Sequence, residues 1–584
     1  MPEKQVTTTF IWNYPGGRDG CISCVAVQAE AYSAYWYHEN PTAIVVRDPR
    51  FEGAGWVTLR LGGWCEEATE GGIVAHTPST FVVPHAADVD LARRLKGRKV
   101  SDRVDLVVRA EGSAIGDYTY QVVFYSDRIE LITSIELTRP VALARCVVGL
   151  SPDGKRSAFF ANSIYDPSPA PHGMSYHTPD QPLTMYHQWF SPAPFCYPLG
   201  LQDGTWMSVS LEPRPDQMRF TRFCTDPDEN GNLAFGIRYE GHPTFDKHYE
   251  SPAVVMRFGA ADAYASLRQH AKGVVAAGKV APIQREAAEW WQGVMVCGWM
   301  AQTPGGTGFA TAGGFAGCTQ ALYEAHVAKY TEVGIEFDIL TIDAGWQTSW
   351  GLWEVDQTKW PDLRGFIDQQ HALGRKVLLW LSPQTDGLPE DELYRVGDRQ
   401  LLDPNNQSWL ARLGKCCQQL LGSGPDSCDA DGIKLDGTGG MPPPGKPVTT
   451  KELHGMEYLH AQLQAIHDAA KAAKSDCLLD FEIANPHFAA LHDMCRLNDF
   501  FLPVDMALMV MRERARVAQA VGFGLAVDTD HPAHEEYFRH SQEFGNISLY
   551  LTDKDLKNPK LVTAIKEGIA ISRARVQSAR TIRK

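Results

Sequence analysis

The sequence predicts a two-part fold, an N-terminal β-sandwich followed by a (β/α)8 TIM barrel. The chain has 584 residues, which is more than one ordinary domain of about 100 to 200 residues requires. Residues 1–260 alternate apolar and polar side chains as antiparallel strands do. From residue 290 onward, short apolar segments alternate with helix-length segments, which is typical of parallel β/α units.

The N-terminal half is predicted to form antiparallel sheets because its apolar runs are rich in β-branched and aromatic residues. Turn signals separate these runs, as at Ser126–Arg128 and in the segment 228–232. Closely spaced strands and turns favour a sandwich over a parallel sheet. The predicted strands include residues 104–112, 118–137, 205–213 and 253–259.

A helical linker is predicted between the two parts, over residues 261–289. Its first segment, ADAYASLRQHAKGVVAAG at 261–278, has helix-forming composition and leads to Trp290 and Trp291. The barrel is then expected to occupy residues 290–584, a length that suits a fold of about 250 residues or more.

Eight strands are predicted in the barrel, and amphipathic helices are predicted between them. The helix over 319–334 should end at Gly334, and another should cover 453–473. An open doubly wound sheet would need a glycine fingerprint after its first strand. The glycine-rich segment 304–317 does not fit that pattern, and we expect a mobile loop over the barrel mouth. The predicted strands are 294–299, 337–346, 376–383, 432–436, 477–483, 499–505, 522–527 and 547–553.

The composition indicates which kinds of binding partner and which cellular compartment to expect. Hydrophobic residues make up 44% and charged residues 21%, as in a globular protein. The 55 Lys and Arg against 70 Asp and Glu give a net charge of −15, which disfavours nucleic acid and anionic membranes as partners. No signal-peptide core or transmembrane run is found, and 13 Cys without framework spacing predict reduced thiols. We therefore expect a cytoplasmic protein, and the sequence leaves open whether it forms a homo-oligomer.

Candidate catalytic residues cluster at the predicted C-terminal ends of the barrel strands, where barrel enzymes place their active sites. Isolated buried carboxylates are costly, so six of them at strand ends indicate function. Carboxylates, aromatic rings and fixed cations together are typical of a site that processes glycosides, and this chemistry needs no metal or other cofactor. The carboxylates are Asp343, Asp436, Glu482, Asp499, Asp505 and Asp528, and beside them stand Trp299, Trp346, Trp380, Lys434 and Arg496.

Three segments carry a specific resemblance. LTIDAGWQ at 340–347, KWPDLRGFIDQQHALGRKVLLWLSP at 359–383 and GIKLDG at 432–437 resemble the retaining α-galactosidase clan, especially its melibiase and raffinose-synthase-like branch. That branch also has a β-sandwich before its barrel. The resemblance implies an oligosaccharide or glycoside substrate and double displacement through a covalent glycosyl-enzyme.

The resemblance also assigns roles to individual residues. Asp436 falls on the nucleophile and Lys434 on its sugar-binding neighbour. The family's Arg-x-x-x-Asp pattern matches CRLNDF at 495–500 with one residue fewer, which places Asp499 as acid/base and Arg496 near the sugar 2-hydroxyl. Asp505 is the alternative acid/base if strand six begins earlier.

The resemblance also implies further substrate contacts, and for some of these residues a purely structural role is the alternative. Glu482 matches a strand-five position that touches the substrate, and Trp299 matches a strand-one tryptophan that lines the sugar pocket, although core packing is an equal reading for Trp299. Asp343, Trp346 and Trp380 complete the predicted substrate-binding set. Asp436 alone could instead be the turn carboxylate of an Asp-Gly pair, and Asp499 or Asp505 could cap a strand or helix.

One departure from the family changes the expected sugar. Galactose-specific relatives have two consecutive Asp residues before Gly-Trp, whereas this chain has Asp343 followed by Ala344. A site that lacks one hydroxyl acceptor should prefer a different sugar. Hydrolysis and glycosyl transfer use the same catalytic residues, so the sequence does not separate them.

Two other classes of function remain open. A metal-dependent barrel hydrolase is suggested by Asp528, Asp530, His531 and His534 in the segment DTDHPAH, although the predicted first strand offers no His ligand. A carbohydrate-binding protein without catalysis is suggested by the altered second strand.

Overall fold

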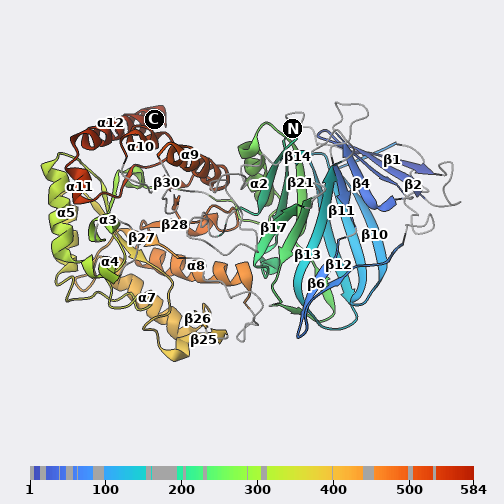
Figure 1. Cartoon of the computed structure of the whole chain (residues 1–584), viewed down its shortest axis with the longest axis horizontal. Coiled ribbons are helices and arrows are strands. Elements are labelled where there is room, and N and C mark those ends of the chain that lie inside the picture. Colours follow the sequence, from blue (N-terminus) through green and yellow to red (C-terminus); the bar gives the residue numbers. More distant parts are fainter. Residues whose placement is uncertain are drawn as a thin grey trace.

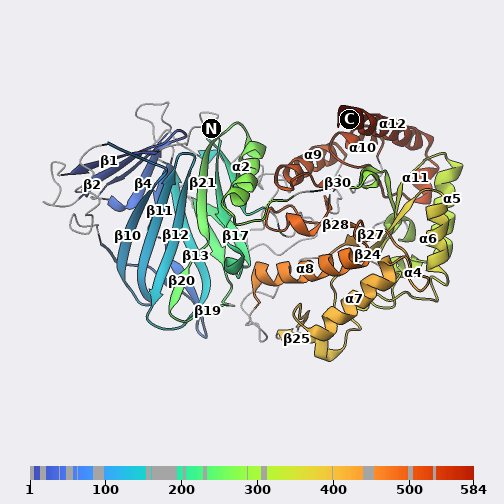
Figure 2. The ribbon, with the colours of Figure 1, turned by 180° about the vertical axis from the view of Figure 1, so that it is seen from behind.

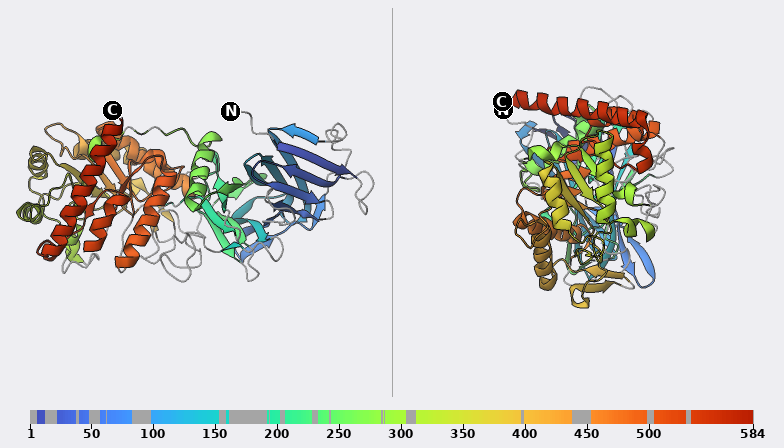
Figure 3. Two further views of the ribbon diagram at one scale, coloured as in Figure 1. Left: turned by 90° about the horizontal axis from the view of Figure 1, so that it is seen from above. Right: turned by 90° about the vertical axis from the view of Figure 1, so that its left-hand side faces the viewer.

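A computed structural model of the whole chain provides the structure of the protein. It describes residues 6–12, 22–37, 40–47, 57–61, 63–82, 98–152, 159–160, 192, 194–201, 206–227, 233–241, 243–283, 285, 287–303, 312–396, 399–437, 453–497, 504–529 and 534–583. The chain forms two units side by side along the long axis, a β-sandwich and a barrel of strands and helices (Figures 1 and 3). The predicted fold class is therefore confirmed.

The first sheet of the sandwich is antiparallel and has 12 strands in the described part of the chain. Its main path runs β17 (Arg222–Pro227), β18 (Leu233–Arg238), β13 (Val141–Pro152), β5 (Val57–Arg60), β4 (Asn40–Arg47), β3 (Ser33–Tyr37), β2 (Ile22–Gln28), β1 (Val6–Trp12), β9 (Arg98–Ser101). Beside this path, β19 (Thr244–Phe245) and β6 (Cys65–Thr69) pair with β13, and β7 (Gly72–His76) pairs with β6.

The second sheet has nine described strands, also antiparallel. Its path runs β14 (Phe159–Phe160), β15 (Cys196–Leu201), β16 (Trp206–Glu212), β21 (Ala253–Ala260), β12 (Arg128–Leu137), β11 (Gly116–Tyr125), β10 (Arg103–Ser113), β8 (Thr80–Val82), and β20 (His248–Glu250) pairs with β12. The four predicted strand segments of this half all fall in this sheet.

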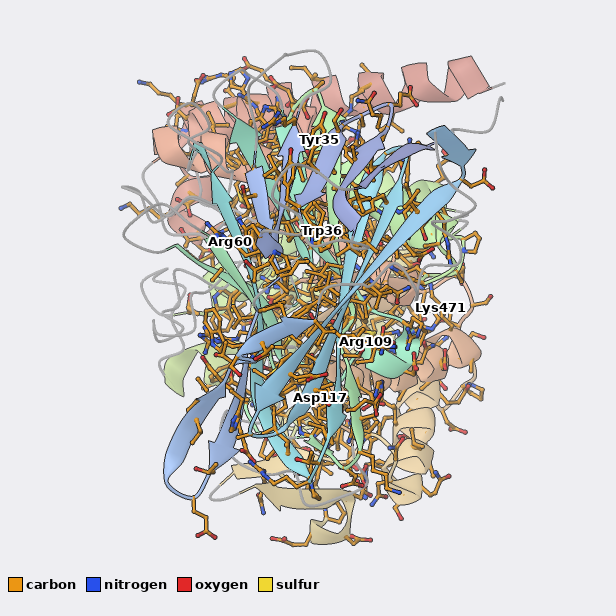
Figure 4. The ribbon with its side chains drawn as sticks, turned by 90° about the vertical axis from the view of Figure 1, so that its right-hand side faces the viewer. Tyr35, Trp36, Arg60, Arg109, Asp117 and Lys471 are labelled. Carbon is orange, nitrogen blue, oxygen red and sulfur yellow. The ribbon has the colours of Figure 1, made fainter. Side chains whose placement is uncertain are left out.

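Alternation places one side of each strand in the core between the sheets. On β3, Trp36 is buried while Tyr35 beside it is half-buried, and both are labelled in Figure 4, which views the molecule from the sandwich end. The labelled Arg109 on β10 and Asp117 on β11 are exposed. Across the core, the Tyr120 hydroxyl donates to the Gly63 carbonyl at 2.9 Å, which ties the second sheet to the first.

The barrel has eight parallel strands in the described residues, in the order β30, β29, β28, β27, β24, β23, β22, β31. A parallel bridge between Asp528 and Asn546 joins the two ends of this order, so the barrel is nearly closed. The strands are β22 (Met295–Cys297), β23 (Ile339–Ile342), β24 (Lys376–Leu381), β27 (Gly432–Leu435), β28 (Leu478–Phe481), β29 (Met494–Arg496), β30 (Ala526–Asp528) and β31 (Ser548–Leu549).

Strand six was predicted in the wrong place. We expected it over 499–505, but β29 covers Met494–Arg496, and Val504 already begins helix α9 (Val504–Val521). The prediction assumed a helix-length segment between strands five and six. The connection 482–493 contains only the short 3-10 turn Ala489–Leu491, so the next strand begins earlier than the alternation suggests.

Helices surround the barrel (Figures 1 and 2). The predicted helix stop at Gly334 is confirmed, since this residue has φ +67° directly after α5. Part of the predicted loop over 304–317 is helical, because Ala312–Gly317 form α4; residues 304–311 lie outside the described part. The helices of the barrel half are α3 (Trp299–Gln302), α4 (Ala312–Gly317), α5 (Gln320–Glu332), α6 (Leu363–Ala372), α7 (Gln407–Leu421), α8 (Gly455–Ala473), α9 (Val504–Val521), α10 (Glu535–His540), α11 (Asp553–Leu556) and α12 (Pro559–Arg583). The hairpin β25 (Leu393–Val396) and β26 (Arg399–Leu402) precedes α7.

The two units join through backbone hydrogen bonds. Helix α8 points toward the sandwich (Figures 1 and 2) and lacks a side-chain N-cap. Its free N–H groups at Met456 and Glu457 donate to the carbonyls of Phe220 and Met218, at 2.9 and 2.8 Å. Gly455 is required there, since it has φ +54° and a Cβ would overlap the Phe220 carbonyl.

Helix α2 (Ala263–Ala276) lies within the predicted linker and packs against β15, β16 and β21 of the sandwich. None of the described helices is both long enough and apolar enough to span a bilayer. The cysteines whose side chains are described are free thiols.

Candidate active site

Asp436 lies directly after β27, at the C-terminal end of the barrel strands. Its Oδ1 accepts from the Gly437 backbone N–H at 2.8 Å and from Arg496 Nη2 at 3.0 Å, and its Oδ2 accepts from Trp380 Nε1 at 3.0 Å. The side chain is 28% exposed, whereas Arg496 beneath it is wholly buried. Three donors therefore orient a carboxylate that still reaches solvent.

The surroundings of Asp436 favour its ionised form. Burial acts to raise its pKa, but the positive charges of Arg496 and Lys434 and the hydrogen bonds from Trp380 and Gly437 outweigh burial and lower the pKa. An ionised carboxylate with fixed donors is able to act as a nucleophile. The Asp-Gly turn also contributes, because Gly437 has φ +69° and turns its N–H toward Oδ1.

Lys434 lies on β27, two residues before Asp436, and its side chain is buried inside the barrel. Its Nζ donates to Asp343 Oδ2 at 2.7 Å and to the Tyr550 hydroxyl at 3.0 Å. The Cys297 thiol donates to the same Asp343 oxygen at 3.0 Å. Burial, together with the Asp343 charge, keeps the pKa of Cys297 well above its usual value, so this sulfur remains a donor. The four side chains come from β22, β27 and the residues that follow β23 and β31.

Arg496 on β29 connects two carboxylates. It forms ion pairs with Asp436 and with Glu482, which follows β28. Glu482 is 4% exposed. A wholly buried guanidinium needs such partners to offset its loss of hydration, and planar Arg orients carboxylates well.

Two further carboxyl groups are buried in the barrel. Asp480 on β28 and Asp528 on β30 are both buried, and Asp528 is the register partner of Arg496. Burial, reinforced by the negative charge of Asp528, raises the pKa of Asp480 well above its usual value. The protonated form of Asp480 is therefore favoured.

Aromatic rings form a rim next to Asp436. Trp299 contacts Phe315 with 5.9 Å between ring centroids, Phe315 contacts Trp350 at 4.8 Å, and Trp350 contacts Trp380 at 5.5 Å. Trp299, Phe315 and Trp350 are half-buried, which leaves part of each ring exposed. Exposed ring faces beside fixed polar groups suit sugar rings, which present apolar C–H faces.

Trp346 and Ala344, which flank Gly345, are buried. Trp346 has no exposed surface, and its Nε1 donates to the Trp380 carbonyl at 2.8 Å, which fixes the loop after β23 against β24. Ala344 is 3% exposed, and its N–H donates to Asp343 Oδ1 at 2.8 Å. This position offers no second carboxylate.

Both acid/base candidates fall where little can be described. Asp499 lies outside the described residues. Asp505 is the second residue of helix α9, so it does not stand on a strand. The acid/base assignment therefore stays a prediction.

The metal hypothesis finds little support among the described residues. Asp528 is buried in the barrel, while His534 is the exposed N-cap of α10 and accepts from Glu536 N–H at 3.2 Å. Asp530 and His531 lie outside the described residues. Three other groups, Asp368, His371 and Asp429, lie close together elsewhere. Their neighbours include cations, since Lys474 Nζ donates to Asp429 at 2.9 Å and Arg364 Nε to Asp368 at 2.8 Å.

Sequence reasoning missed four members of the site. Tyr550 follows strand eight, and inspection of strand ends for hydroxyl groups as well as carboxylates would have found it. Phe315 and Trp350 come from segments without strand periodicity, so no sequence pattern marks them. Asp480 was hidden inside the apolar run of strand five, where only its cost of burial sets it apart.

Comparisons with known proteins agree with this architecture. Residues 307–414, which include β23, α6 and β24, match the family model described as the glycosyl hydrolases family 31 TIM-barrel domain. A search of curated proteins finds no match.

Solved structures resemble almost the whole chain. The cycloalternan-degrading enzyme from Trueperella pyogenes has a TM-score of 0.50 at 12% identity, over 90% of this chain and 83% of that one. A variant GH36 α-galactosidase from Geobacillus stearothermophilus, in complex with 1-deoxygalactonojirimycin, has a TM-score of 0.50 at 12% identity, over 95% and 86%.

The cycloalternan-forming enzyme from Listeria monocytogenes has a TM-score of 0.50 at 11% identity, over 97% of this chain and 61% of that one. At such identities the likeness establishes the fold. This chain thus has the fold of glycoside hydrolases, with part of its barrel matching family 31.

Proposed function

We propose that this protein is a retaining glycosidase that cleaves α-linked sugars by double displacement. The observation that carries the proposal is the environment of Asp436, an ionised and partly exposed carboxylate held by Trp380, Gly437 and Arg496. The family 31 match and the resemblance to glycoside hydrolases support the same reaction class.

In the proposed first step, an Asp436 oxygen attacks the anomeric carbon, and the bond from that carbon to the leaving oxygen breaks. The acid/base residue, Asp499 or alternatively Asp505, protonates the leaving oxygen. Water, deprotonated by the same residue, then attacks the anomeric carbon and releases Asp436. The positive charge that develops on the sugar is stabilised by the ionised carboxylates around it.

The sugar-binding roles follow from the contacts. Arg496 lies within hydrogen-bond reach of Asp436 and would meet the 2-hydroxyl of a sugar bound there. Lys434 and Asp343 form the polar floor, and the rim of Trp299, Phe315, Trp350 and Trp380 would hold sugar rings.

We propose that galactose is not the preferred sugar. With Ala344 buried in place of a second Asp, the floor offers only the Asp343 carboxylate to the distal hydroxyls. A missing acceptor removes a hydrogen bond that discriminates between sugars that differ at one hydroxyl. We expect an α-glucoside to be turned over faster than the matching α-galactoside.

The test is turnover of aryl α- and β-glycosides of glucose, galactose and pentopyranoses by the wild type and Asp436→Asn. We expect activity on an α-glycoside, with kcat lowered at least about 10³-fold by the substitution, since it removes the nucleophile. Asp362→Asn is the matched control. Asn also caps helices well, so the exposed N-cap of α6 should tolerate it with activity unchanged.

A covalent probe separates this proposal from simple sugar binding. An α-glycosyl fluoride with a second fluorine at C5 should label the wild type, and peptide mass spectrometry should find the sugar on Asp436. Label on another carboxylate, or turnover that survives Asp436→Asn, would refute the assignment. Binding of the sugars without turnover would instead favour the inactive carbohydrate-binding protein.

The acid/base residue is tested separately with Asp499→Ala and Asp505→Ala. Loss of the acid should slow substrates with poor leaving groups far more than activated aryl glycosides, and azide should restore turnover as a glycosyl azide. The substitution that shows this pattern identifies the residue. Chromatography of the products in the presence of added sugar acceptors distinguishes hydrolysis from transfer.

A further inference from the structure

A cavity lies in the sandwich, far along the chain from Asp436. It has a volume of about 660 Å³ and is lined by the turns 30–31 and 126–128, by the end of β21 and by helix α2. Ligand pockets usually measure about 300 to 1,000 Å³. The cavity is therefore large enough for a small metabolite.

Arg257 is a buried guanidinium in the wall of this cavity. It is 5% exposed, and its Nη1 donates to Glu212 and to Ser210 Oγ. Among the described residues, Nε and Nη2 have no hydrogen-bond acceptor. That edge faces Gly273 of α2, where a Cβ would overlap Nη2. The absence of a side chain at Gly273 leaves the guanidinium edge uncovered.

The charges around Arg257 do not balance. Glu212 is wholly buried and is the acceptor for both Arg257 and Lys279, whose Nζ lies 3.3 Å from Glu212 Oε2. His270, 3.4 Å from the same carboxylate, stays neutral because burial lowers its pKa despite the Glu212 charge. One carboxylate thus faces two cations, and a buried excess charge is costly unless something neutralises it.

The neighbouring strand β12 does not remove this excess of positive charge. Arg128 is the register partner of Arg257 on β12 and also lines the cavity. Like charges directly opposite one another on neighbouring strands repel. Arg128 is paired with the buried Glu130 at 2.7 Å, and its second partner, Asp127 at 3.2 Å, is exposed, so that water screens the charge of Asp127. The buried charge of Arg257 is therefore not cancelled.

We propose that this cavity binds a small hydroxylated anion, through a carboxylate or phosphate group placed on the Nε and Nη2 edge of Arg257. A guanidinium edge presents two parallel N–H donors that fit two oxygens of such a group. Lys272 at the exposed rim adds a further cation, and Gln269 Oε1, buried without a donor among the described residues, is free to accept from a hydroxyl.

The acidic residues of the wall restrict the ligand further. Glu30 and Asp127 also line the cavity, and both are exposed. They oppose a ligand that is anionic throughout and accept hydrogen bonds from hydroxyls. A sugar phosphate or a sugar acid has one anionic end and several hydroxyls, and so matches both parts of the wall.

The test is isothermal titration calorimetry of the full chain with inorganic phosphate, glucose 6-phosphate, glucuronate and glucose. We expect one site per chain for the charged sugars, and we expect their titration to be unchanged in the presence of excess glucose, since glucose would occupy only the site at Asp436. Tighter binding of glucose 6-phosphate than of glucuronate would identify phosphate as the anionic group, and the reverse order would identify carboxylate. Binding of phosphate alone, as tight as that of the sugar phosphate, would identify the free ion.

Gly273→Ala is the decisive variant, since its methyl group would displace the Arg257 edge. We expect it to weaken anion binding at least about tenfold, as the loss of a charge-assisted hydrogen bond should. Gly414→Ala in α7 is the matched control, because a Cβ there meets nothing within 4 Å. It should leave binding unchanged, and turnover of the α-glycoside should be unchanged in both variants.

Ala276→Trp provides an independent check, because Ala276 lines the cavity at an exposed position of α2 where a large side chain need not disturb folding. We expect Trp to fill the cavity and abolish anion binding. Anion binding that persists in both Gly273→Ala and Ala276→Trp would place the anion elsewhere and overturn the proposal. Absence of binding of any anion to the wild type would overturn it as well.

Discussion

The barrel and the sandwich each bury a cluster of charges, and the two clusters are unbalanced in opposite directions. In the barrel, two cations, Lys434 and Arg496, face five carboxyl groups. The carboxyl groups are those of Asp343, Asp436, Asp480, Glu482 and Asp528. In the sandwich, one carboxylate, that of Glu212, faces Arg257 and Lys279.

This difference indicates what each site is suited to bind. Excess carboxylates retain a proton, as the raised pKa of Asp480 shows, and they stabilise positive charge that develops on a bound sugar. Excess cations attract an anion. A buried imbalance of charge is costly for stability alone, so its sign indicates the ligand.

The largest effect should come from removing one cation from each cluster. Arg496→Met would leave Asp436 and Glu482 without their shared partner, and we expect a loss of about 3 to 5 kcal/mol in the free energy of unfolding. Lys279→Met would leave Glu212 paired with Arg257, so we expect a loss below about 1 kcal/mol. Urea titrations of both variants measure the difference. Equal losses of unfolding free energy in the two variants would contradict the opposite charge imbalances of the two clusters.

Acid should destabilise the protein through its buried neutral histidines. Burial lowers the pKa of His487 to about 3, and burial likewise lowers the pKa of His492 to about 3. The folded pKa lies below the unfolded value of about 6.5. Their stabilisation is therefore present above about pH 6.5 and is lost as the pH falls toward 3.

At pH 5, each histidine that stays neutral in the folded protein lowers the free energy of unfolding by about 2 kcal/mol, because only the unfolded chain takes up the proton. Unfolding titrations at pH 7 and 5 should show this loss, and His487→Gln should reduce it. His248→Gln is the control, since His248 is exposed beside Glu136 at 2.9 Å. If both substitutions reduced the loss of stability at pH 5 equally, the loss could not be attributed to the burial of His487.

The smallest effect should come from Asp480→Asn. Asp480 is already neutral in the folded protein, so an isosteric amide should change the free energy of unfolding by less than about 1 kcal/mol at pH 4, where much of the unfolded chain also carries the proton. Asp343→Asn, which leaves Lys434 without its carboxylate partner, should cost more. If Asp480→Asn destabilises as much as Asp343→Asn, Asp480 is ionised.

The pH dependence of Asp480→Asn gives a second test. A folded pKa above the unfolded value of about 4 means that the stabilisation by Asp480 is complete below about pH 4 and is lost as the pH rises toward the folded pKa. The wild type should therefore lose stability relative to the variant between pH 4 and 7. A constant difference over that range would contradict the raised pKa.

Much of the barrel was predictable because its strands are short apolar runs with polar residues at their ends. Asp436, Lys434 and Trp380 were identified from such strand ends, and the structure brings them together. Strand six was misplaced because the connection 482–493 has no α-helix. Arg496 was identified nevertheless, since its motif is local, and it is the last residue of β29.

Local sequence thus determined the two-part fold, most strands of the barrel and several residues around Asp436, because period-two and β/α patterns arise from neighbours along the chain. Only the tertiary structure placed Tyr550 beside Lys434, Trp350 beside Trp380 and Arg257 beneath Gly273. Each of these pairs joins segments from different elements. Charge balance inside a folded protein depends on such distant neighbours, so the signs of the two buried clusters became visible only when the chain was folded.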